Sequence, residues 1–190
     1  MKFIILILPL ITLLSACGSH NVKPINTVEY VDLNRFMGDW YVIANIPTFI
    51  ETDAVNAIES YEMNQDGSIA TTFTFYEGSP DGERKQYNPT GFIVDQESNA
   101  LWDMQFIWPF KAEYRVIYLD EDYQITIIGR SKRDYVWLMA RLPVIGDDTY
   151  DKLLKYMASQ GYDIEKIQRV PQVWPKQSDT AQNIDEVKAQ

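Results

Sequence analysis

The sequence predicts an all-β fold, an eight-stranded antiparallel up-and-down barrel with one C-terminal α-helix packed outside it. Three observations support this prediction. From Gly38 to Arg141, short runs rich in β-branched and aromatic residues follow one another, with turn residues between them. No helical pattern interrupts these runs, so consecutive strands are expected to be antiparallel. After Pro143 the pattern changes to a single amphipathic one.

The predicted strands are separated by short turn sequences rich in Gly, Pro, Asn and Asp. One example is the stretch at residues 64–67, in which Gly67 can adopt a positive φ. Closing the strands into a barrel removes the exposed edges through which strands aggregate. The eight predicted strands are residues 40–46, 57–63, 69–76, 87–94, 101–108, 113–119, 123–129 and 134–141.

One amphipathic helix is predicted over about residues 147–160. Asp147 or Asp148 can cap its start, and Gly161 can end it. Residues 164–170 are predicted as a short extra strand, and the polar tail 176–190 is predicted to be disordered. The apolar side chains at helical spacing are Tyr150, Leu153, Leu154, Met157 and Ala158.

Residues 1–16 have the pattern of a secretory signal peptide. Lys2 precedes an apolar run of about a dozen residues, which is too short to span a bilayer. The sequence LSAC at residues 14–17 resembles the lipobox of bacterial lipoproteins. In that family the signal is removed before the cysteine, which receives a diacylglycerol thioether and an amide-linked acyl chain such as palmitate. The resemblance implies that Cys17 is a lipid anchor. An ordinary signal peptide that contains a cysteine stays open as the alternative.

The lipoprotein resemblance also implies a location. Gly18, which follows the cysteine, is not the aspartate that favours retention in the inner membrane. The resemblance therefore implies a lipid-anchored protein of the outer membrane, on its periplasmic face. Two or more acyl chains anchor a protein stably, and residues 17–27 are predicted as the lipidated tether. Cys17 is the only cysteine, so no disulfide is expected.

The composition argues against several classes of function. The formal charge is −10 and no cluster of Lys and Arg is present, which disfavours nucleic-acid binding. The only histidine is His20, in the tether, so we expect neither a Ser-His-Asp site nor a His and Cys zinc site in the domain. The acidic run 120–122 lacks the spacing of a calcium loop and is interpreted as a solvated turn. We therefore predict no catalytic residue, no metal site and no cofactor.

Period-2 alternation predicts which side chains face the barrel interior. An eight-stranded barrel has room either for packed side chains or for one small ligand. Aromatic and apolar residues share one face of several predicted strands, so they are interpreted either as the wall of a ligand cavity or as core that fills the barrel. The candidate ligand-binding residues are Phe73, Phe75, Trp102, Met104, Phe106, Tyr114, Val116, Tyr118, Tyr135 and Trp137.

Three motifs resemble those of the lipocalin family. The sequence GDWY at residues 38–41 resembles the Gly-x-Trp signature at the first lipocalin strand. The sequence YRVIYLDEDYQ at residues 114–124 resembles the second motif, although it lacks the Thr-Asp-Tyr form of many animal members. Arg141 ends the last predicted barrel strand, as the third motif requires. The resemblance spans about residues 31–173, within a predicted domain of residues 28–175, and bacterial outer-membrane lipocalins look most similar.

The lipocalin resemblance implies structural roles for Gly38, Trp40 and Arg141. In this family the tryptophan closes one end of the barrel and the arginine lies over its ring, a cation–π contact worth about 0.5–2 kcal/mol. The sequence NPTGF at residues 88–92 departs from the Gly-Lys pair that relatives often carry there. This departure concerns the cavity wall rather than the fold.

Together these features predict an outer-membrane-anchored protein that stores or transports single-acyl-chain lipids, lysophospholipid or fatty acid, for envelope maintenance. The alternative is a structural envelope lipoprotein with a filled barrel and no ligand. An enzyme acting on lipids or isoprenoids, as a few lipocalin relatives are, would need paired carboxylates facing inward, and the pattern contains no convincing pair. The resemblance allows a homodimer, although no residue pattern indicates one.

Overall fold

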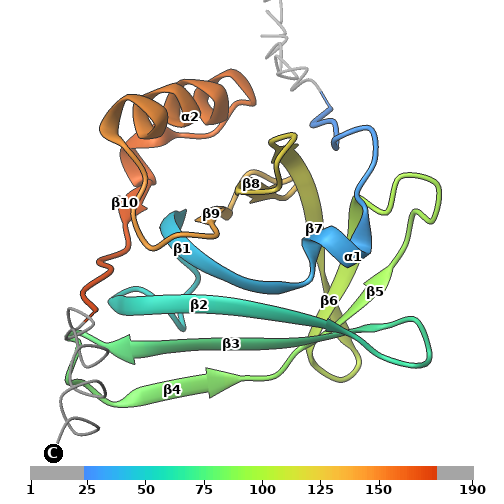
Figure 1. The fold of residues 1–190 in the computed structure, drawn as a ribbon, viewed down its shortest axis with the longest axis horizontal. Helices are drawn as coiled ribbons and strands as arrows, with labels where there is room; N and C mark the ends of the chain where they lie inside the picture. The colour runs from blue at the N-terminus through green and yellow to red at the C-terminus, as the bar shows by residue number, and fades with distance from the viewer. Residues whose placement is uncertain (1–23, 175–190) are drawn as a thin grey trace, which may run out of the picture.

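The computed structural model describes residues 24–174, which form a closed antiparallel barrel with a helix outside it (Figure 1). The predicted signal peptide, Cys17 and the tail 176–190 lie outside the described residues. The strands are β1 (Gly38–Ile46), β2 (Ala54–Met63), β3 (Ile69–Glu77), β4 (Arg84–Tyr87), β5 (Thr90–Ile93), β6 (Leu101–Ile107), β7 (Phe110–Leu119), β8 (Ile125–Gly129), β9 (Val136–Ala140) and β10 (Gln168–Arg169). The helices are α1 (Leu33–Phe36), α2 (Asp147–Ser159) and a short 3-10 helix (Ile164–Lys166).

The barrel has the predicted up-and-down topology. Neighbouring strands follow chain order, every pair is antiparallel, and β9 pairs with β1 to close the barrel. The fourth barrel strand is interrupted, because β4 and β5 both pair with β3 and are separated by Asn88 and Pro89. Proline has no N–H to donate, so it breaks the strand, but its carbonyl still accepts a hydrogen bond from Thr71 N at 3.0 Å. The predicted barrel is therefore confirmed.

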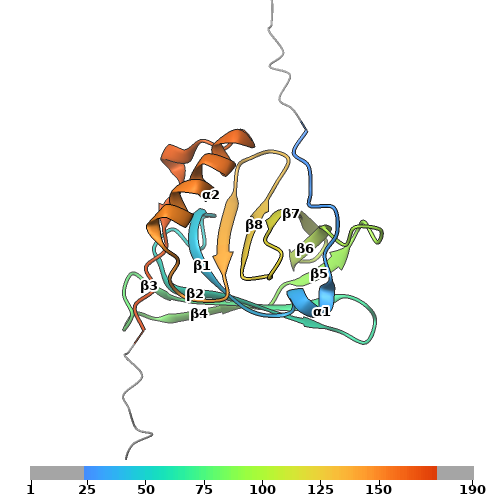
Figure 2. The same ribbon diagram turned by 45° about the horizontal axis from the view of Figure 1, so that its top comes forward.

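The chain buries two apolar clusters, one on each side of the sheet. The inner cluster fills part of the barrel and includes Trp40, Phe73 and Trp102. The outer cluster lies between the barrel wall and α2, whose Leu153 and Met157 are buried against it. Figures 1 and 2 show α2 lying outside the barrel. The helix thus covers one part of the wall and leaves the interior to the strands.

The helix start and the segment after it differ in detail from prediction. Gly146 is the N-cap of α2, without a side-chain hydrogen bond. The expectation that Asp147 or Asp148 caps the helix is therefore wrong. Both lie in the first turn, where their negative charges interact favourably with the positive end of the helix dipole. Within the predicted extra strand 164–170, Ile164–Lys166 form the 3-10 helix, and only β10 forms a strand, which pairs with β1 outside the barrel closure.

The two ends of the barrel are different. At one end, α1 precedes β1 and lies across the barrel, next to the turn between β7 and β8, where Tyr123 Oη accepts a hydrogen bond from Asp32 N at 2.8 Å. The opposite end holds the β8–β9 loop, beside which the described chain begins (Figure 2). Ile25 is buried in the outer cluster, so the folded part already includes the end of the predicted tether.

Within residues 24–174, no helix has the length and apolar character needed to cross a membrane.

Candidate ligand-binding cavity

Trp40 closes the α1 end of the barrel. Its side chain is fully buried, and its indole Nε1 donates a hydrogen bond to Phe36 O at 2.8 Å. The guanidinium carbon of Arg141 lies 3.8 Å from the centre of the indole ring, which is a cation–π geometry. Gly38 has a φ of +92°, and a Cβ there would lie 3.5 Å from Arg141 Nη1. Glycine therefore lets the chain turn into β1 beneath the guanidinium.

Arg141 also joins the closed end through hydrogen bonds to backbone carbonyls. Nη1 donates to Asp39 O at 2.7 Å, and Nη2 donates to the carbonyls of Arg35 and Met37, each at 2.8 Å. These carbonyls belong to the last turn of α1 and the start of β1, where a short helix leaves acceptors without partners. Partial burial lowers the pKa of the Arg141 guanidinium below its ordinary value.

Aromatic side chains fill the barrel directly above this floor. The Trp102 and Tyr114 rings stack with centres 4.8 Å apart, and Phe36 meets Trp102 edge-on at 5.5 Å. The Tyr61 and Tyr114 hydroxyls are 2.7 Å apart. Rings in these arrangements stabilise one another beyond the burial of their area. This half of the barrel is packed core, as the second interpretation of the aromatic pattern predicted.

The other half of the barrel contains a cavity of about 410 Å³. Strands β2, β3, β4, β6, β7 and β9, the junction between β4 and β5, and the loops at the β8–β9 end supply its wall. A cavity of this size with an apolar lining is typical of a small-molecule site. Its lining residues are Thr48, Phe49, Ile50, Glu51, Glu59, Thr71, Phe73, Tyr87, Asn88, Pro89, Met104, Phe106, Ile107, Phe110, Lys111, Ala112, Glu113, Tyr114, Arg130, Tyr135 and Trp137.

The ten candidate ligand-binding residues divide into three groups. Six of them line the cavity, namely Phe73, Met104, Phe106, Tyr114, Tyr135 and Trp137. Three others are buried in the inner cluster but do not line the cavity. Of these, Phe75 packs against Phe73 and Tyr87, with ring centres 5.3 and 6.3 Å away, whereas Trp102 and Val116 belong to the packed half. Alternation predicts the face of a residue, but not how far along the barrel the cavity extends.

Tyr118 is not an interior residue, so its predicted position is wrong. The pairing of β7 with β8 shifts between Val116 and Tyr118, which places an extra residue in β7. Such a bulge breaks the alternation, so Tyr118 leaves the face that Tyr114 and Val116 share. Its ring centre lies 5.4 Å from that of Tyr156 on α2, in the outer cluster.

Three carboxylates line the cavity, those of Glu51, Glu59 and Glu113, and the sequence pattern did not predict them. Glu51 comes from the β1–β2 loop and is 2% exposed. It accepts hydrogen bonds from Thr48 N at 3.0 Å, from Thr48 Oγ1 at 2.9 Å and from Trp137 Nε1 at 3.2 Å. Burial raises the pKa of Glu51 above its ordinary value, while these hydrogen bonds oppose the change. The bonds fix Glu51 to the loop and the wall, so its role is structural.

Glu59 lies on the inner face of β2. One of its oxygens accepts a hydrogen bond from the Tyr61 hydroxyl. Burial, together with the nearby charge of Glu51, raises the pKa of Glu59 from 4.5 to about 7, although the Tyr61 hydrogen bond opposes this. The alternation of Ala57, Glu59, Tyr61 and Met63 along one face was the signal that could have identified it.

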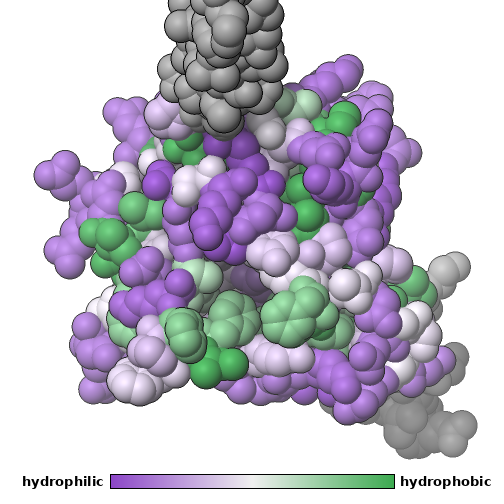
Figure 3. Space-filling model, turned by 180° about the vertical axis from the view of Figure 1, so that it is seen from behind, coloured by the Kyte–Doolittle hydropathy of each residue, from purple (hydrophilic) through white to green (hydrophobic). Residues whose placement is uncertain are grey.

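The mouth of the cavity combines an apolar rim with charged groups. Phe49, Ile107, Trp108 and Phe110 are between 72% and 89% exposed. In the view of Figure 3, hydrophobic side chains gather along one side of a hollow and hydrophilic ones lie on the other side. Contiguous exposed apolar residues mark interaction sites more often than scattered ones do.

Two cations, Lys111 and Arg130, are part of the cavity lining. Lys111 Nζ lies 4.0 Å from the centre of the Phe92 ring and 4.0 Å from an Asp103 oxygen. Arg130 forms an ion pair with Asp134 at 3.4 Å, yet its Nε is buried with no hydrogen-bond partner among the described residues. A buried guanidinium N–H without an acceptor is costly, so the site can accommodate a ligand oxygen there.

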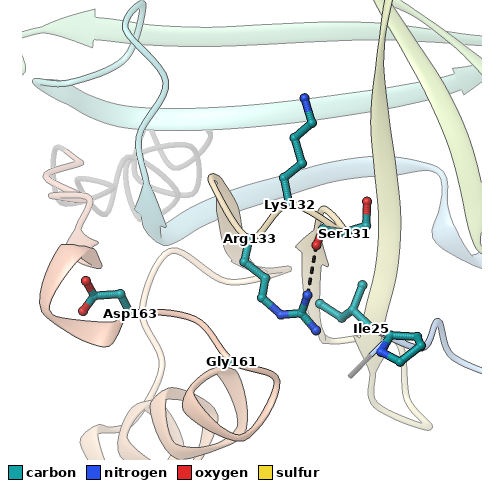
Figure 4. Close-up of a pocket in the computed structure, with 7 residues that line it drawn as sticks. Ile25, Ser131, Lys132, Arg133, Gly161 and Asp163 are labelled. Atoms are coloured by element: carbon teal, nitrogen blue, oxygen red, sulfur yellow. Dashed lines mark hydrogen bonds between the residues drawn. The ribbon is translucent and has the colours of Figure 1, made fainter. Parts of the chain in front are cut away.

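A second hollow, of about 560 Å³, lies on the outer surface between the start of the described chain, the β8–β9 loop and the end of α2. Figure 4 shows Ile25 beside Ser131 and Arg133, with Arg133 Nη1 donating to Ser131 O at 2.9 Å. Polar and apolar groups both contribute to its lining. This region shows where the described chain begins. Pro24 lies beside the β8–β9 loop, which also borders the mouth of the cavity.

The remaining predicted site features concern metal ions and the acidic turn. Within residues 24–174, no cluster of His, Cys, Asp or Glu has the composition of a metal site. Asp120 Oδ1 accepts hydrogen bonds from Gln124 N and Ile125 N, each at 2.7 Å. The acidic run therefore stabilises the β7–β8 turn.

Comparison with known proteins gives consistent matches. A family model described as a lipocalin-like domain matches residues 31–172. Temperature-induced lipocalin-1 of Arabidopsis thaliana is 31% identical, over 84% of this chain and 89% of that protein. The outer membrane lipoprotein Blc of Citrobacter freundii is 29% identical, over 87% of this chain and 90% of that protein. Insecticyanin of the tobacco hornworm Manduca sexta is 17% identical and superposes with a TM-score of 0.59, over 82% of this chain and 85% of that chain.

Proposed function

The chain belongs to the lipocalin family, and on that premise we propose that it is an outer-membrane lipoprotein that stores or transports a single-acyl-chain lipid, a lysophospholipid or a fatty acid, for envelope maintenance. The observation that carries the proposal is the apolar cavity of about 410 Å³ inside the barrel. Burial of each methylene contributes about 0.8 kcal/mol. A chain of a dozen carbons therefore binds well without many polar contacts.

The lining matches the two parts of such a ligand. Phe73, Met104 and Trp137 offer an apolar wall for the acyl chain. At the mouth, Lys111 and the unpartnered Nε of Arg130 can donate hydrogen bonds to the negative oxygens of a phosphate or carboxylate. The open cavity also disfavours the alternative of a filled barrel, since only the half near Trp40 is packed with side chains.

The position of the mouth supports exchange with a membrane. Cys17 is proposed as the lipidated anchor, as in the lipoproteins that the N-terminal sequence resembles, and 1–16 as its signal peptide. The described chain begins at Pro24, beside the β8–β9 loop. Six residues lie between Cys17 and Pro24, and the seven chain steps from one to the other span at most about 25 Å. An anchor of this length keeps the mouth and its exposed aromatic rim close to the bilayer surface.

The experiment that tests the proposal has two steps. The purified protein is extracted with organic solvent, and the extract is analysed by mass spectrometry for a co-purifying lipid. The lipid-free protein is then titrated with lysophospholipid and with fatty acid, following displacement of the hydrophobic probe N-phenyl-1-naphthylamine. Saturable displacement at about one lipid per barrel is expected. A folded protein that binds neither lipid nor probe would refute the proposal.

A further inference from the structure

The interior of the cavity holds two polar groups, Thr71 and Glu59, whose hydrogen-bonding capacity a plain acyl chain cannot complete. Thr71 lies on β3, is 3% exposed and lines the cavity. Its hydroxyl has no hydrogen-bond partner among the described residues. A buried hydroxyl without a partner costs free energy of folding, so such a group in a binding cavity indicates a ligand atom that satisfies it.

Glu59 is the second group, and it lies close to the first. In the pairing of β2 with β3, Glu59 is opposite Phe73 and Tyr61 is opposite Thr71. Glu59 and Thr71 are therefore diagonal neighbours on the inner face, typically about 7–8 Å apart at their Cα atoms. The Tyr61 hydroxyl occupies one Glu59 oxygen, and the second oxygen is available to the cavity.

The two groups lie deep in the cavity, away from the cations at the mouth. Glu59 pairs with Trp40, the residue that closes the barrel floor. A ligand whose anionic head is held near Arg130 places the far end of its chain toward Glu59. A terminal methyl there would bury a carboxyl and a hydroxyl against hydrocarbon, which is unfavourable for both.

We infer that Glu59 and Thr71 form a polar subsite that binds a hydroxyl group at the inner end of the ligand, so that the preferred ligand is a hydroxylated acyl chain rather than a plain one. The inference rests on the proposed function and specifies its ligand class. A hydroxyl can donate to the free Glu59 oxygen and accept from the Thr71 hydroxyl. Since the pKa of Glu59 is about 7, the carboxyl can also donate a proton when it is neutral.

A preference for the hydroxylated chain is the opposite of what an entirely apolar cavity would show, so relative affinities can test it. An added hydroxyl lowers the affinity of a chain for an apolar cavity, whereas a site with unpaired polar groups discriminates strongly against the ligand that lacks it. The test uses matched pairs of ligands, namely decanoate, dodecanoate and hexadecanoate against the acids of the same length that carry a hydroxyl on the terminal carbon. Each acid displaces N-phenyl-1-naphthylamine from the lipid-free full chain.

For at least one chain length, the hydroxylated acid is expected to bind at least tenfold more tightly than its parent. The double variant Glu59→Leu with Thr71→Val removes both polar groups and should reverse this ratio in favour of the parent acid. Glu62→Leu is the matched control, because Glu62 is exposed on the outer face of the same strand. It should retain the wild-type ratio. Far-ultraviolet circular dichroism and melting temperature verify that each variant is folded.

The outcomes separate this inference from the proposed function. If the parent acids bind the wild-type protein at least as well at every length, the hydroxyl subsite is wrong while lipid binding stands. The same conclusion follows if the single variants Glu59→Gln and Thr71→Val and the double variant all leave the ratio unchanged. If none of the acids and no lysophospholipid displaces the probe, both the proposed function and the subsite are wrong.

Discussion

Arg141 and Trp40 close the barrel together, with the guanidinium carbon 3.8 Å from the centre of the indole ring. The same side chain donates hydrogen bonds to carbonyls on either side of Gly38. Arg141, which directly follows β9, therefore connects the last barrel strand to the first and to α1. The indole ring packs against one face of the guanidinium, and the backbone carbonyls accept hydrogen bonds from its N–H groups. The two sets of contacts hold Arg141 in one orientation.

Replacing Arg141 with alanine is expected to lower the free energy of unfolding by about 3 kcal/mol. The variant loses the cation–π contact and several hydrogen bonds to carbonyls, each worth about 1 kcal/mol or more with a charged donor. Chemical denaturation followed by circular dichroism measures the change. Arg84→Ala, an exposed position on β4, serves as the control and should be nearly neutral. Lipid preference should not change, because the cavity lies in the other half. An unchanged midpoint in Arg141→Ala would contradict the role of this contact.

Glu59 is expected to make the stability of the lipid-free protein fall as pH rises. The native carboxyl has a pKa of about 7 against an ordinary value of 4.5. Between these values the folded state holds a proton that the unfolded state has released, so stability decreases with pH through this window and levels off above it. At about 1.36 kcal/mol for each pKa unit, the loss approaches about 3 kcal/mol.

Urea denaturation at several pH values between 4 and 8 measures this effect. The variant Glu59→Gln lacks the titrating group and should show a flatter profile in the same window. Glu51 remains in that variant, and its raised pKa preserves a smaller decrease of the same sign. Parallel profiles for the variant and the wild type would show that Glu59 titrates normally.

Much of the fold was predictable because most of each barrel strand keeps a period of two, apart from the register shifts in four strand pairs. The β3 face with Ile69, Thr71, Phe73 and Phe75 is buried as the alternation predicts. The closed end was also predictable, since Gly38, Trp40 and Arg141 occupy motif positions. These features depend on residues close in sequence or on a recognisable signature.

The errors come from interactions that only the folded chain reveals. The bulge after Val116 moves Tyr118 to the outer face, and nothing in the local sequence YRVIY predicts this bulge. Glu51 enters the cavity because a loop folds back to Thr48 and Trp137, which periodicity does not describe. The alternation along β2 could have placed Glu59 on the inner face, but a charged side chain is usually expected to face solvent.

Filling the cavity should abolish lipid binding and leave the fold intact. Ala112 lines the cavity on β7, opposite Met104. The variant Ala112→Phe places a ring in the space for the acyl chain, so displacement of N-phenyl-1-naphthylamine by lysophospholipid should weaken at least tenfold. Ala70 lies on the β3 face opposite to Thr71 and Phe73, and Ala70→Phe is the control with the same added volume. Equal lipid affinity in both variants would place the ligand outside the barrel.

The exposed rim at the mouth should mediate contact with a lipid surface. Trp108 and Phe110 are 81% and 75% exposed at the β6–β7 turn, and an exposed aromatic side chain gains free energy by entering the membrane interface. The double variant Trp108→Ser with Phe110→Ser should transfer lipid between vesicles several-fold more slowly, while its affinity for lysophospholipid stays within about twofold. Transfer is followed with a fluorescent lysophospholipid moving from donor to acceptor vesicles.

The matched control for the rim lies at the opposite end of the barrel. Leu142 and Val144 follow Arg141 and are 66% and 72% exposed. The double variant Leu142→Ser with Val144→Ser removes a comparable apolar surface, but one that faces away from the mouth, so its transfer rate should equal that of the wild type. Equal slowing in both double variants would mean that surface hydrophobicity in general, rather than the mouth, governs transfer. Slowing in the rim variant alone would tie lipid exchange to the end of the barrel where the described chain begins.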